Sequence, residues 1–184
     1  MTPSGIFRGA ALLAASLAFA QQVPRPAADL TISYLDGHKA RLADYRGKVV
    51  LLACISTTCP HCKRATAVLT RLQNEFGPKG LQVLETALDH DAQTSVPGFV
   101  SETHPSFPVG YITVNQAWDF LALPDTARLM YPIVAIIDRG GNVRFQATGA
   151  DAVLSNEDTQ EASLRQEIDK VLKEPGHGRR AAAK

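Results

Sequence analysis

The sequence contains only three cysteines in 184 residues, and all of them fall between positions 54 and 62. Three are too few for the disulfide framework of a small secreted domain, and a chain of this length can bury an adequate core without one. An excess of either charge is also missing, because 19 lysines and arginines face 18 aspartates and glutamates. Such a balance gives no electrostatic basis for binding a polyanion, so we expect no nucleic-acid partner.

Long apolar runs are scarce as well, and the most prominent one lies at the N-terminus. Arg8 precedes residues 9–20, which are almost wholly apolar and end in an Ala-Phe-Ala sequence. A positive residue, a short apolar stretch and a small-x-small end are typical of a secretory signal peptide. A permanent membrane span needs about 20 apolar residues, which is more than this stretch supplies.

These features predict three segments, namely a signal peptide over residues 1–20, one domain over 21–174 and a flexible basic tail over 175–184. We therefore expect a periplasmic or otherwise extracytoplasmic location. Membrane attachment is expected only if residues 1–20 are not cleaved.

The apolar pattern between the termini predicts an α/β domain. Residues 49–55 are apolar throughout, which indicates a strand buried on both faces of a sheet. A helix is predicted to begin at Cys59-Pro60 and to end at the Gly-Pro pair 77–78, and residues 81–88 form a second predicted buried strand. Further strands are predicted at 30–35, 40–42, 107–114, 130–137 and 143–147, and further helices at 97–104, 115–123 and from Ser155 to the Pro-Gly pair at 175.

The segment Cys59-Pro60-His61-Cys62 is the part of the sequence that predicts chemistry. Thiol–disulfide exchange needs one thiolate that attacks and a second thiol that resolves the mixed disulfide. Two intervening residues at a helix start bring both sulfurs within reach, and the unpaired N–H groups there stabilise negative charge on the first sulfur. Cys59 is therefore the candidate nucleophile and Cys62 the resolving thiol, while His61 should further favour the thiolate and make the couple more oxidising.

The same Cys-x-x-Cys spacing also occurs in zinc sites and in structural disulfides. It could be half of a zinc site, but the remaining histidines and Cys54 form no second ligand pair at a recognisable spacing, so we expect no metal. It could be an inert disulfide, but such a short loop would stabilise the fold little. Cys54 lies within the predicted buried strand, where a free cysteine behaves as a small apolar residue.

The order of several motifs resembles the TlpA/ResA branch of the thioredoxin superfamily, over about residues 27–173. The matching segments are Asp36-Gly37, the run from Leu42 to Leu52, Cys59-Pro60-His61-Cys62, the run from Tyr131 to Asp138, and Gly140-Gly141-Asn142-Val143. This resemblance implies a thioredoxin-like fold, with a central mixed β-sheet flanked by helices, an N-terminal β-hairpin and a central insertion. It also implies that Pro132 is cis and faces the cysteine pair, and that Tyr131 and Pro132 shape the substrate surface.

The sequence departs from the family pattern at two positions. Many members have a tryptophan directly before the first cysteine, where this chain has Thr58. Thioredoxins proper carry a buried acid six residues before the first cysteine, where this chain has Ala53. The proton acceptor for Cys62 is therefore unassigned, and Asp89 is a candidate for that role or a plain turn residue.

The expected function is disulfide exchange with protein thiols, served by a redox partner protein and needing no bound cofactor. One alternative is a thiol peroxidase of the peroxiredoxin type, which would place a threonine three residues before the reactive cysteine, where Ser56 stands. Another is a copper-binding thiol carrier that uses Cys59, His61 and Cys62, since soft thiolates hold Cu(I).

Overall fold

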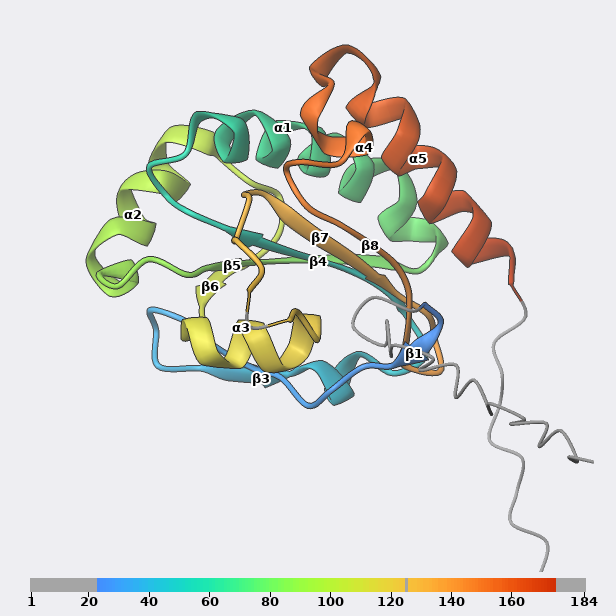
Figure 1. The fold of residues 1–184 in the computed structure, drawn as a ribbon, viewed down its shortest axis with the longest axis horizontal. Helices are drawn as coiled ribbons and strands as arrows, with labels where there is room; N and C mark the ends of the chain where they lie inside the picture. Colours follow the sequence, from blue (N-terminus) through green and yellow to red (C-terminus); the bar gives the residue numbers. More distant parts are fainter. Residues whose placement is uncertain (1–22, 125, 175–184) are drawn as a thin grey trace, which may run out of the picture.

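A computed structural model describes residues 23–124 and 126–174. The predicted signal peptide and the predicted basic tail lie outside the described residues. Within them, eight strands form one mixed sheet in the order β1-β8-β7-β4-β5-β6-β2-β3, with helices on both of its faces (Figure 1). This is the predicted fold class, a central mixed sheet flanked by helices.

The centre of the sheet consists of the strands that the sequence predicts to be buried on both faces. β4 (Val49–Ile55) and β5 (Leu81–Ala87) run parallel, and β7 (Ile133–Ile137) pairs with β4 on its other side in the antiparallel direction. Every residue of β4 and of β7 is buried, because helices cover both faces of these strands. The helix α1 (Pro60–Phe76) connects β4 to β5.

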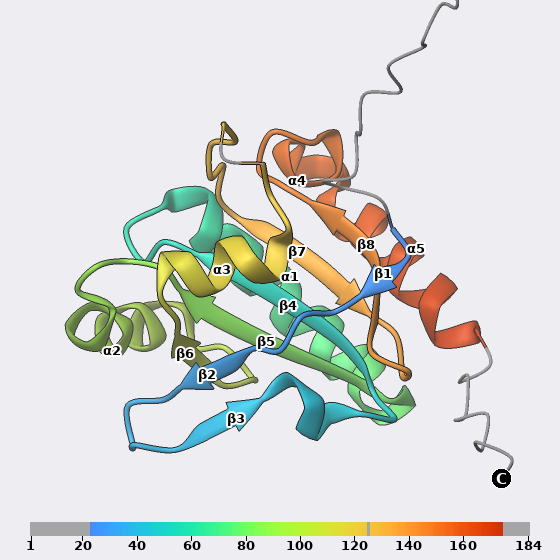
Figure 2. The same ribbon diagram turned by 60° about the horizontal axis from the view of Figure 1, so that its bottom comes forward.

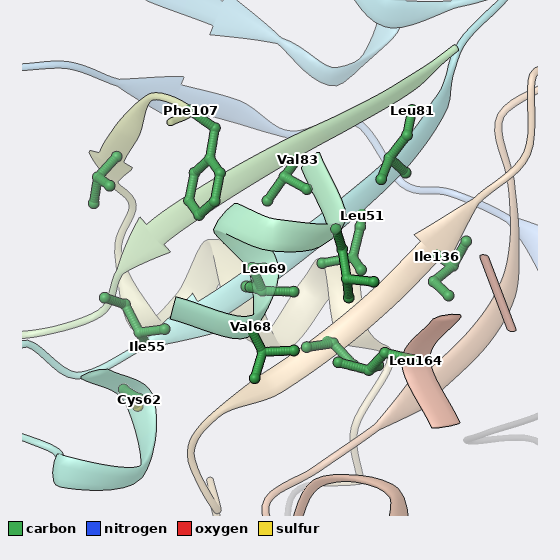
Figure 3. Packing of buried hydrophobic residues seen from close by; sticks show 14 of the residues in the cluster. Leu51, Ile55, Cys62, Val68, Leu69, Leu81, Val83, Phe107, Ile136 and Leu164 are labelled. Carbon is green, nitrogen blue, oxygen red and sulfur yellow. The ribbon is translucent and has the colours of Figure 1, made fainter. Parts of the chain in front are cut away.

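Two apolar layers lie on opposite faces of this sheet. One face is covered by α1, α2 (Ala92–Thr103), α4 (Ala152–Ser155) and α5 (Glu157–Lys173). The other face is covered by α3 (Val114–Leu121), which Figure 2 shows in front of the sheet with α1 behind it. Figure 3 shows the first layer from close by, with Leu51, Val83 and Ile136 of the sheet facing Val68, Leu69 and Leu164 of the helices.

The outer strands are short. β2 (Thr31–Ser33) and β3 (Lys39–Arg41) form the predicted N-terminal hairpin, and β2 joins the sheet through β6 (Val109–Tyr111). The residues before this hairpin contribute β1 (Arg25–Pro26), which pairs with β8 (Asn142–Ala147) at the opposite edge of the sheet. Two 3₁₀ turns complete the described elements, η1 (Leu42–Tyr45) and η2 (Gly77–Lys79).

The central insertion, between β5 and β7, differs from the sequence prediction in its element boundaries. α2 begins at Ala92, five residues before the predicted start, because the Asp91 carbonyl accepts the first-turn N–H groups; Pro97 then lies inside the helix and removes one donor. The strand predicted at 107–114 is only β6. It is cut short because the Thr113 hydroxyl caps α3 by accepting the Gln116 N–H at 3.2 Å.

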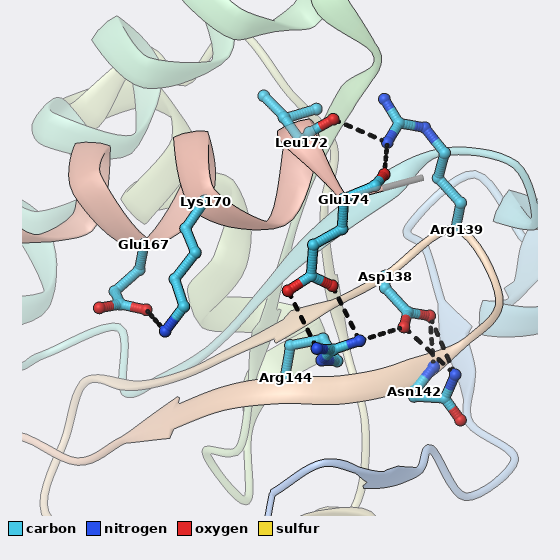
Figure 4. Close-up of polar contacts among 8 residues, drawn as sticks. All are labelled: Asp138, Arg139, Asn142, Arg144, Glu167, Lys170, Leu172 and Glu174. Atoms are coloured by element: carbon cyan, nitrogen blue, oxygen red, sulfur yellow. Dashed lines mark hydrogen bonds and ion pairs between the residues drawn. The ribbon is translucent and has the colours of Figure 1, made fainter. Parts of the chain in front are cut away.

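The last helix begins shortly after the predicted start at Ser155, since Asn156 caps α5 through its side chain. Its C-terminal end is fastened to the β7–β8 hairpin, as Figure 4 shows. Arg144 donates to Glu174 at 2.9 Å and lies 3.2 Å from Asp138, while Arg139 donates to the Leu172 carbonyl at 3.0 Å. These contacts fix α5 against the sheet and therefore fix its N-terminus near the start of α1.

None of the described helices is both long and apolar enough to cross a membrane.

Candidate active site

The Cys-Pro-His-Cys segment lies where β4 ends and α1 begins, as predicted. Cys59 is the N-cap residue of α1, with extended backbone, and Pro60 is the first helical residue. A proline fits there because its missing N–H would have no partner within the helix. The Cys59 N–H donates to the Ser56 carbonyl at 3.2 Å, and the Cys59 carbonyl accepts the Lys63 N–H at 3.2 Å, which closes the first turn.

The two cysteines differ in their access to solvent. Both thiols are unpaired; Cys59 is half-buried, while Cys62 has 0% exposure and belongs to the apolar layer beneath α1 (Figure 3). Burial raises the pKa of the Cys62 thiol, and a backbone hydrogen bond from Ser56 opposes part of this rise. The arrangement can therefore present one sulfur to a partner molecule and keep the second protonated behind it.

Asp89, the candidate proton acceptor, instead holds the loop before Cys59. One carboxylate oxygen accepts the Ser56 hydroxyl at 2.7 Å, and the other accepts the Thr57 N–H at 2.8 Å. Both oxygens are thus occupied by the segment that leads into α1. This geometry favours the interpretation of Asp89, which lies just after β5, as a structural turn residue.

Glu85 is the acidic residue that the sequence reasoning missed. It lies in β5 directly opposite Ala53 of β4, with 0% exposure, on the sheet face that α1 covers. Burial raises the pKa of its carboxyl to about 8, and the negative charge of Glu85 is one of the influences that raise the pKa of Cys62. The sequence contained a signal for it, because Glu85 is the one charged residue in the predicted buried strand 81–88. Burying a carboxyl is energetically unfavourable, so a glutamate in such a strand indicates a specific role.

Thr66 connects Glu85 to the helix that carries the cysteines. Its hydroxyl oxygen lies 2.8 Å from Oε1 of Glu85 and 2.9 Å from the carbonyl oxygen of Cys62. Oε2 of Glu85 is buried and has no hydrogen-bond partner within the described residues. A buried carboxyl with one free oxygen, near a buried thiol, can hold or receive a proton there.

His61 is exposed and takes part in a polar cluster. Nη2 of Arg64 lies 2.8 Å from Nδ1 of His61, and Glu157 at the start of α5 lies 3.4 Å from the same nitrogen and forms an ion pair with Arg64. A guanidinium can only donate, so Nδ1 of His61 is the acceptor in a hydrogen bond with Arg64. The guanidinium of Arg64 is therefore a cation in direct contact with the motif, in addition to the imidazole that the sequence singles out.

The Tyr131–Pro132 peptide bond is cis, as the family resemblance implies. Pro132 is buried and Tyr131 is half-buried, in contact with the layer that contains Cys59 and Cys62. Burial raises the pKa of Tyr131 to about 12, with smaller contributions from Cys54, Asp89 and both active-site cysteines, so its hydroxyl stays protonated near them.

Cys54 lies on the opposite face of the sheet from Cys62. It has 1% exposure and packs in the layer covered by α3, and burial raises its thiol pKa to about 12. These features agree with the structural role expected for it.

Two further observations concern ligands. Within residues 23–124 and 126–174, no group of three histidine, cysteine, aspartate or glutamate side chains is placed to hold a metal ion. A groove of about 710 Å³ lies between the end of β5 and the starts of α2 and α3, and its wall includes Asp89, Asp91 and Tyr111. Asp89 therefore connects this groove to the loop that precedes Cys59.

Comparison with known proteins places this site in a family. Residues 23–146 match the AhpC/TSA family. The thiol-disulfide oxidoreductase ResA of Geobacillus kaustophilus is 29% identical over 123 residues, which cover 67% of each chain. A ResA of Bacillus cereus is 30% identical over 123 residues, covering 66% of this chain and 67% of that protein.

A solved structure agrees in fold. A putative thiol:disulfide interchange protein DsbE from Chlorobium tepidum superimposes with a TM-score of 0.68 at 23% identity, covering 81% of this chain and 96% of that one. The chain therefore belongs to the AhpC/TSA family, and it is a thioredoxin-like enzyme of the thiol–disulfide oxidoreductase class predicted from its Cys-x-x-Cys segment.

Proposed function

We propose that this enzyme exchanges disulfides with protein thiols in an extracytoplasmic compartment, with Cys59 as the nucleophile and Cys62 as the resolving thiol. The observation that carries the proposal is the contrast between the two sulfurs at the start of α1. Cys59 is half-buried at the N-cap, and Cys62 is fully buried one turn later. A substrate can reach the first sulfur, whereas only Cys59 can reach the second.

The exchange conserves atoms and electrons in two steps. In the reductive direction, the Cys59 thiolate attacks a substrate disulfide, one Cys59–substrate bond forms, and the other substrate sulfur leaves as a thiolate. Cys62 then loses its proton and attacks Cys59. The Cys59–Cys62 bond forms and the second substrate sulfur leaves with the electron pair. The oxidative direction is the reverse.

We further propose that Glu85 is the proton partner of Cys62. It would take the role of the buried acid that thioredoxins proper carry at the position of Ala53. Cys62 is buried with a raised pKa, so its proton needs an acceptor that is also inside the protein. Glu85 lies on the same sheet face, and its pKa of about 8 lets it both hold and release a proton near neutral pH.

Tyr131 and Pro132 are proposed to form part of the surface that holds the substrate chain. Support comes from the half-buried Tyr131 packed against the layer of Cys59, and from Met130 beside it, which is 49% exposed. An exposed apolar side chain beside the Tyr131–Pro132 segment suits an unfolded or extended protein segment. A separate redox partner protein would restore the Cys59–Cys62 couple.

The reactive cysteines are tested with single serine variants. Cys59→Ser should abolish exchange, and Cys62→Ser should accumulate mixed disulfides that migrate as larger species on a non-reducing gel. Cys54→Ser is the matched control, since Cys54 lies on the other face of the sheet. Full exchange activity in the Cys59→Ser variant would overturn the proposal.

The direction of electron flow follows from the reduction potential, measured against glutathione buffers. A value of about −120 mV would mark an oxidant of substrates, and a value of about −270 mV would mark a reductase.

The location is proposed from the signal-like sequence of residues 1–20 and is tested independently. A fusion of the full chain to a reporter enzyme that is active only after export should be active. Deletion of residues 1–20 should abolish that signal, and an unchanged signal would contradict the proposed export. Mass analysis of the purified protein shows whether the chain then begins at residue 21, as the domain boundary requires.

The peroxidase alternative is less well supported by the structure. Position 56, where that chemistry expects a threonine, is occupied by a serine whose hydroxyl is already donated to Asp89 at 2.7 Å. A hydrogen peroxide consumption assay with the dithiol protein separates the two activities. The copper-carrier alternative has no third ligand beside the two cysteines among the described residues, because His61 is directed to Arg64 and Glu157.

A further inference from the structure

Thr66 lies between the resolving cysteine and the buried acid. It follows Cys62 by one helical turn, has 0% exposure, and faces the sheet at the level of Glu85. Its hydroxyl oxygen has two oxygen neighbours, the Cys62 carbonyl at 2.9 Å and Oε1 of Glu85 at 2.8 Å. Both distances are those of ordinary hydrogen bonds.

A hydroxyl has a single proton, so Thr66 cannot donate fully to both neighbours. The Cys62 carbonyl can only accept. If Thr66 donates to that carbonyl, its contact with Glu85 is a hydrogen bond only when the carboxyl carries a proton and donates it to Thr66. If Thr66 instead donates to Oε1, a protonated carboxyl would carry its proton on Oε2, which is buried and has no hydrogen-bond partner among the described residues. This second arrangement therefore suits the ionised carboxylate.

We propose that Thr66 is a one-proton switch of this site, donating to the Cys62 carbonyl while Glu85 is protonated and to the Glu85 carboxylate when Glu85 is ionised. The inference rests on the proposed function only for its role in exchange. The switch costs little in helix stability, because the carbonyl of Cys62 keeps its regular helical bond from the backbone of Thr66.

The switch matters because the surroundings of Glu85 give its carboxylate no other help. Its register partners are Ala53 on β4 and Val109 on β6, and the titratable group facing it from α1 is Cys62. No cationic side chain among the described residues contributes to its ionisation. A charge-assisted hydrogen bond from Thr66 is about twice as strong as a neutral one, so it selectively stabilises the ionised form.

During resolution, the switch prepares the acceptor for the proton of Cys62. While Glu85 is ionised, Thr66 holds Oε1, and Oε2 has no partner among the described residues. Cys62 attacks Cys59 of the mixed disulfide, the Cys62–Cys59 bond forms, and the bond from Cys59 to the substrate breaks. The electron pair leaves with the substrate sulfur, and the proton of Cys62 passes to Glu85. Thr66 then turns its own proton back to the Cys62 carbonyl.

Three substitutions separate the hydroxyl from the volume of the side chain. Thr66→Val keeps the shape and removes the hydroxyl, Thr66→Ser keeps the hydroxyl, and Thr66→Ala removes it while favouring the helix. Thr66→Ala therefore serves as the second test if Thr66→Val does not fold. A residue that only packs would give the same Glu85 titration in all three variants.

The measurement is the titration of the Glu85 side-chain carboxyl carbon by NMR in the dithiol protein, with Glu85→Gln identifying the signal. We expect the midpoint near 8 in the wild type and in Thr66→Ser. In Thr66→Val and Thr66→Ala it should rise by about one pH unit, a tenfold smaller ionised fraction. An unchanged midpoint in the folded variants without the hydroxyl, or a rise in Thr66→Ser equal to theirs, would overturn the proposal.

This titration uses no substrate, so its outcome is independent of exchange activity. If Cys59→Ser retained activity, the proposed function would fail while the titration could still show the switch. If the titration failed and Cys59→Ser were inactive, only the role of Thr66 would be lost.

Discussion

Ala53 and Glu85 lie directly opposite each other on the parallel strands β4 and β5. Side chains of paired residues point to the same face of a sheet, so the carboxyl of Glu85 occupies the space beside the position where thioredoxins proper carry their acid. A buried acid can thus be supplied to one site from either of two neighbouring strands. For this chain, the missing acid at position 53 is matched by an acid 32 residues later in the sequence and next to it in space.

Glu85 should make the stability of the protein depend on pH. Its pKa is raised in the folded state to about 8 from 4.5, so the folded state binds more protons than the unfolded state between these values. Stability therefore falls as pH rises from about 4.5 to about 8. Glu85→Gln should flatten this dependence, measured as the urea midpoint at pH 5 and at pH 8.5. Glu102→Gln, on the surface, should keep the pH dependence of the wild type. An equal change in urea midpoint between the two pH values in all three proteins would contradict the prediction.

Asp89 should hold the loop before Cys59 in place. In Asp89→Asn, the carboxylate that accepts from Ser56 and Thr57 is replaced by an amide with a single accepting oxygen. Loss of one charge-assisted hydrogen bond should lower the free energy of unfolding by about 1.5–3 kcal/mol. The measurement is urea denaturation of the dithiol form. Asp91→Asn, in the same turn but with an exposed side chain, is the matched control and should change stability by less than about 0.5 kcal/mol.

Gly149 should position the Tyr131–Pro132 segment. A Cβ at residue 149 would lie 2.4 Å from the carbonyl oxygen of Tyr131 and 3.0 Å from that of Met130, both backbone atoms. Gly149→Ala should therefore push this segment away from Cys59 and lower kcat/KM for a protein disulfide by about ten- to a hundredfold. Gly98→Ala, in α2 with no atom within 4 Å of the added methyl, should keep full activity. Unchanged kinetics in Gly149→Ala would remove the segment from the substrate site.

Arg64 and Glu157 should tune the reduction potential in opposite directions. A cation near the thiolate of Cys59 stabilises the reduced form, and an anion destabilises it. Arg64→Gln should thus lower the potential and Glu157→Gln should raise it. Both side chains are substantially exposed, so each shift should be on the order of 10–20 mV and should shrink at high salt. Glutathione equilibration at low and high salt measures both shifts, and shifts of the same sign would show that charge is not the cause.

The sequence was informative about the site wherever the signal was local. The unbroken apolar run of β4, the Cys-x-x-Cys segment and the proline at the first helical position are all features of adjacent residues. They predicted a strand, a turn and a helix with Cys59 at its cap, and the structure confirms this arrangement. The predicted ends of α2, β6 and α3 differ from the observed ones. The ends of these elements depend on single capping contacts, such as that of Thr113 with Gln116, which the apolar pattern does not reveal.

What the sequence by itself determined is therefore the fold class, the family and the place of the two cysteines. The tertiary structure alone decided which acid lies on the sheet face of Cys62, since the register of β4 against β5 sets Glu85 on that face while Asp89 is bound to the loop. It also decided the partners of His61, because Arg64 and Glu157 meet only when α5 packs beside α1. The reason is physical: proton transfer and charge effects act over a few ångströms of space, whatever the separation along the chain.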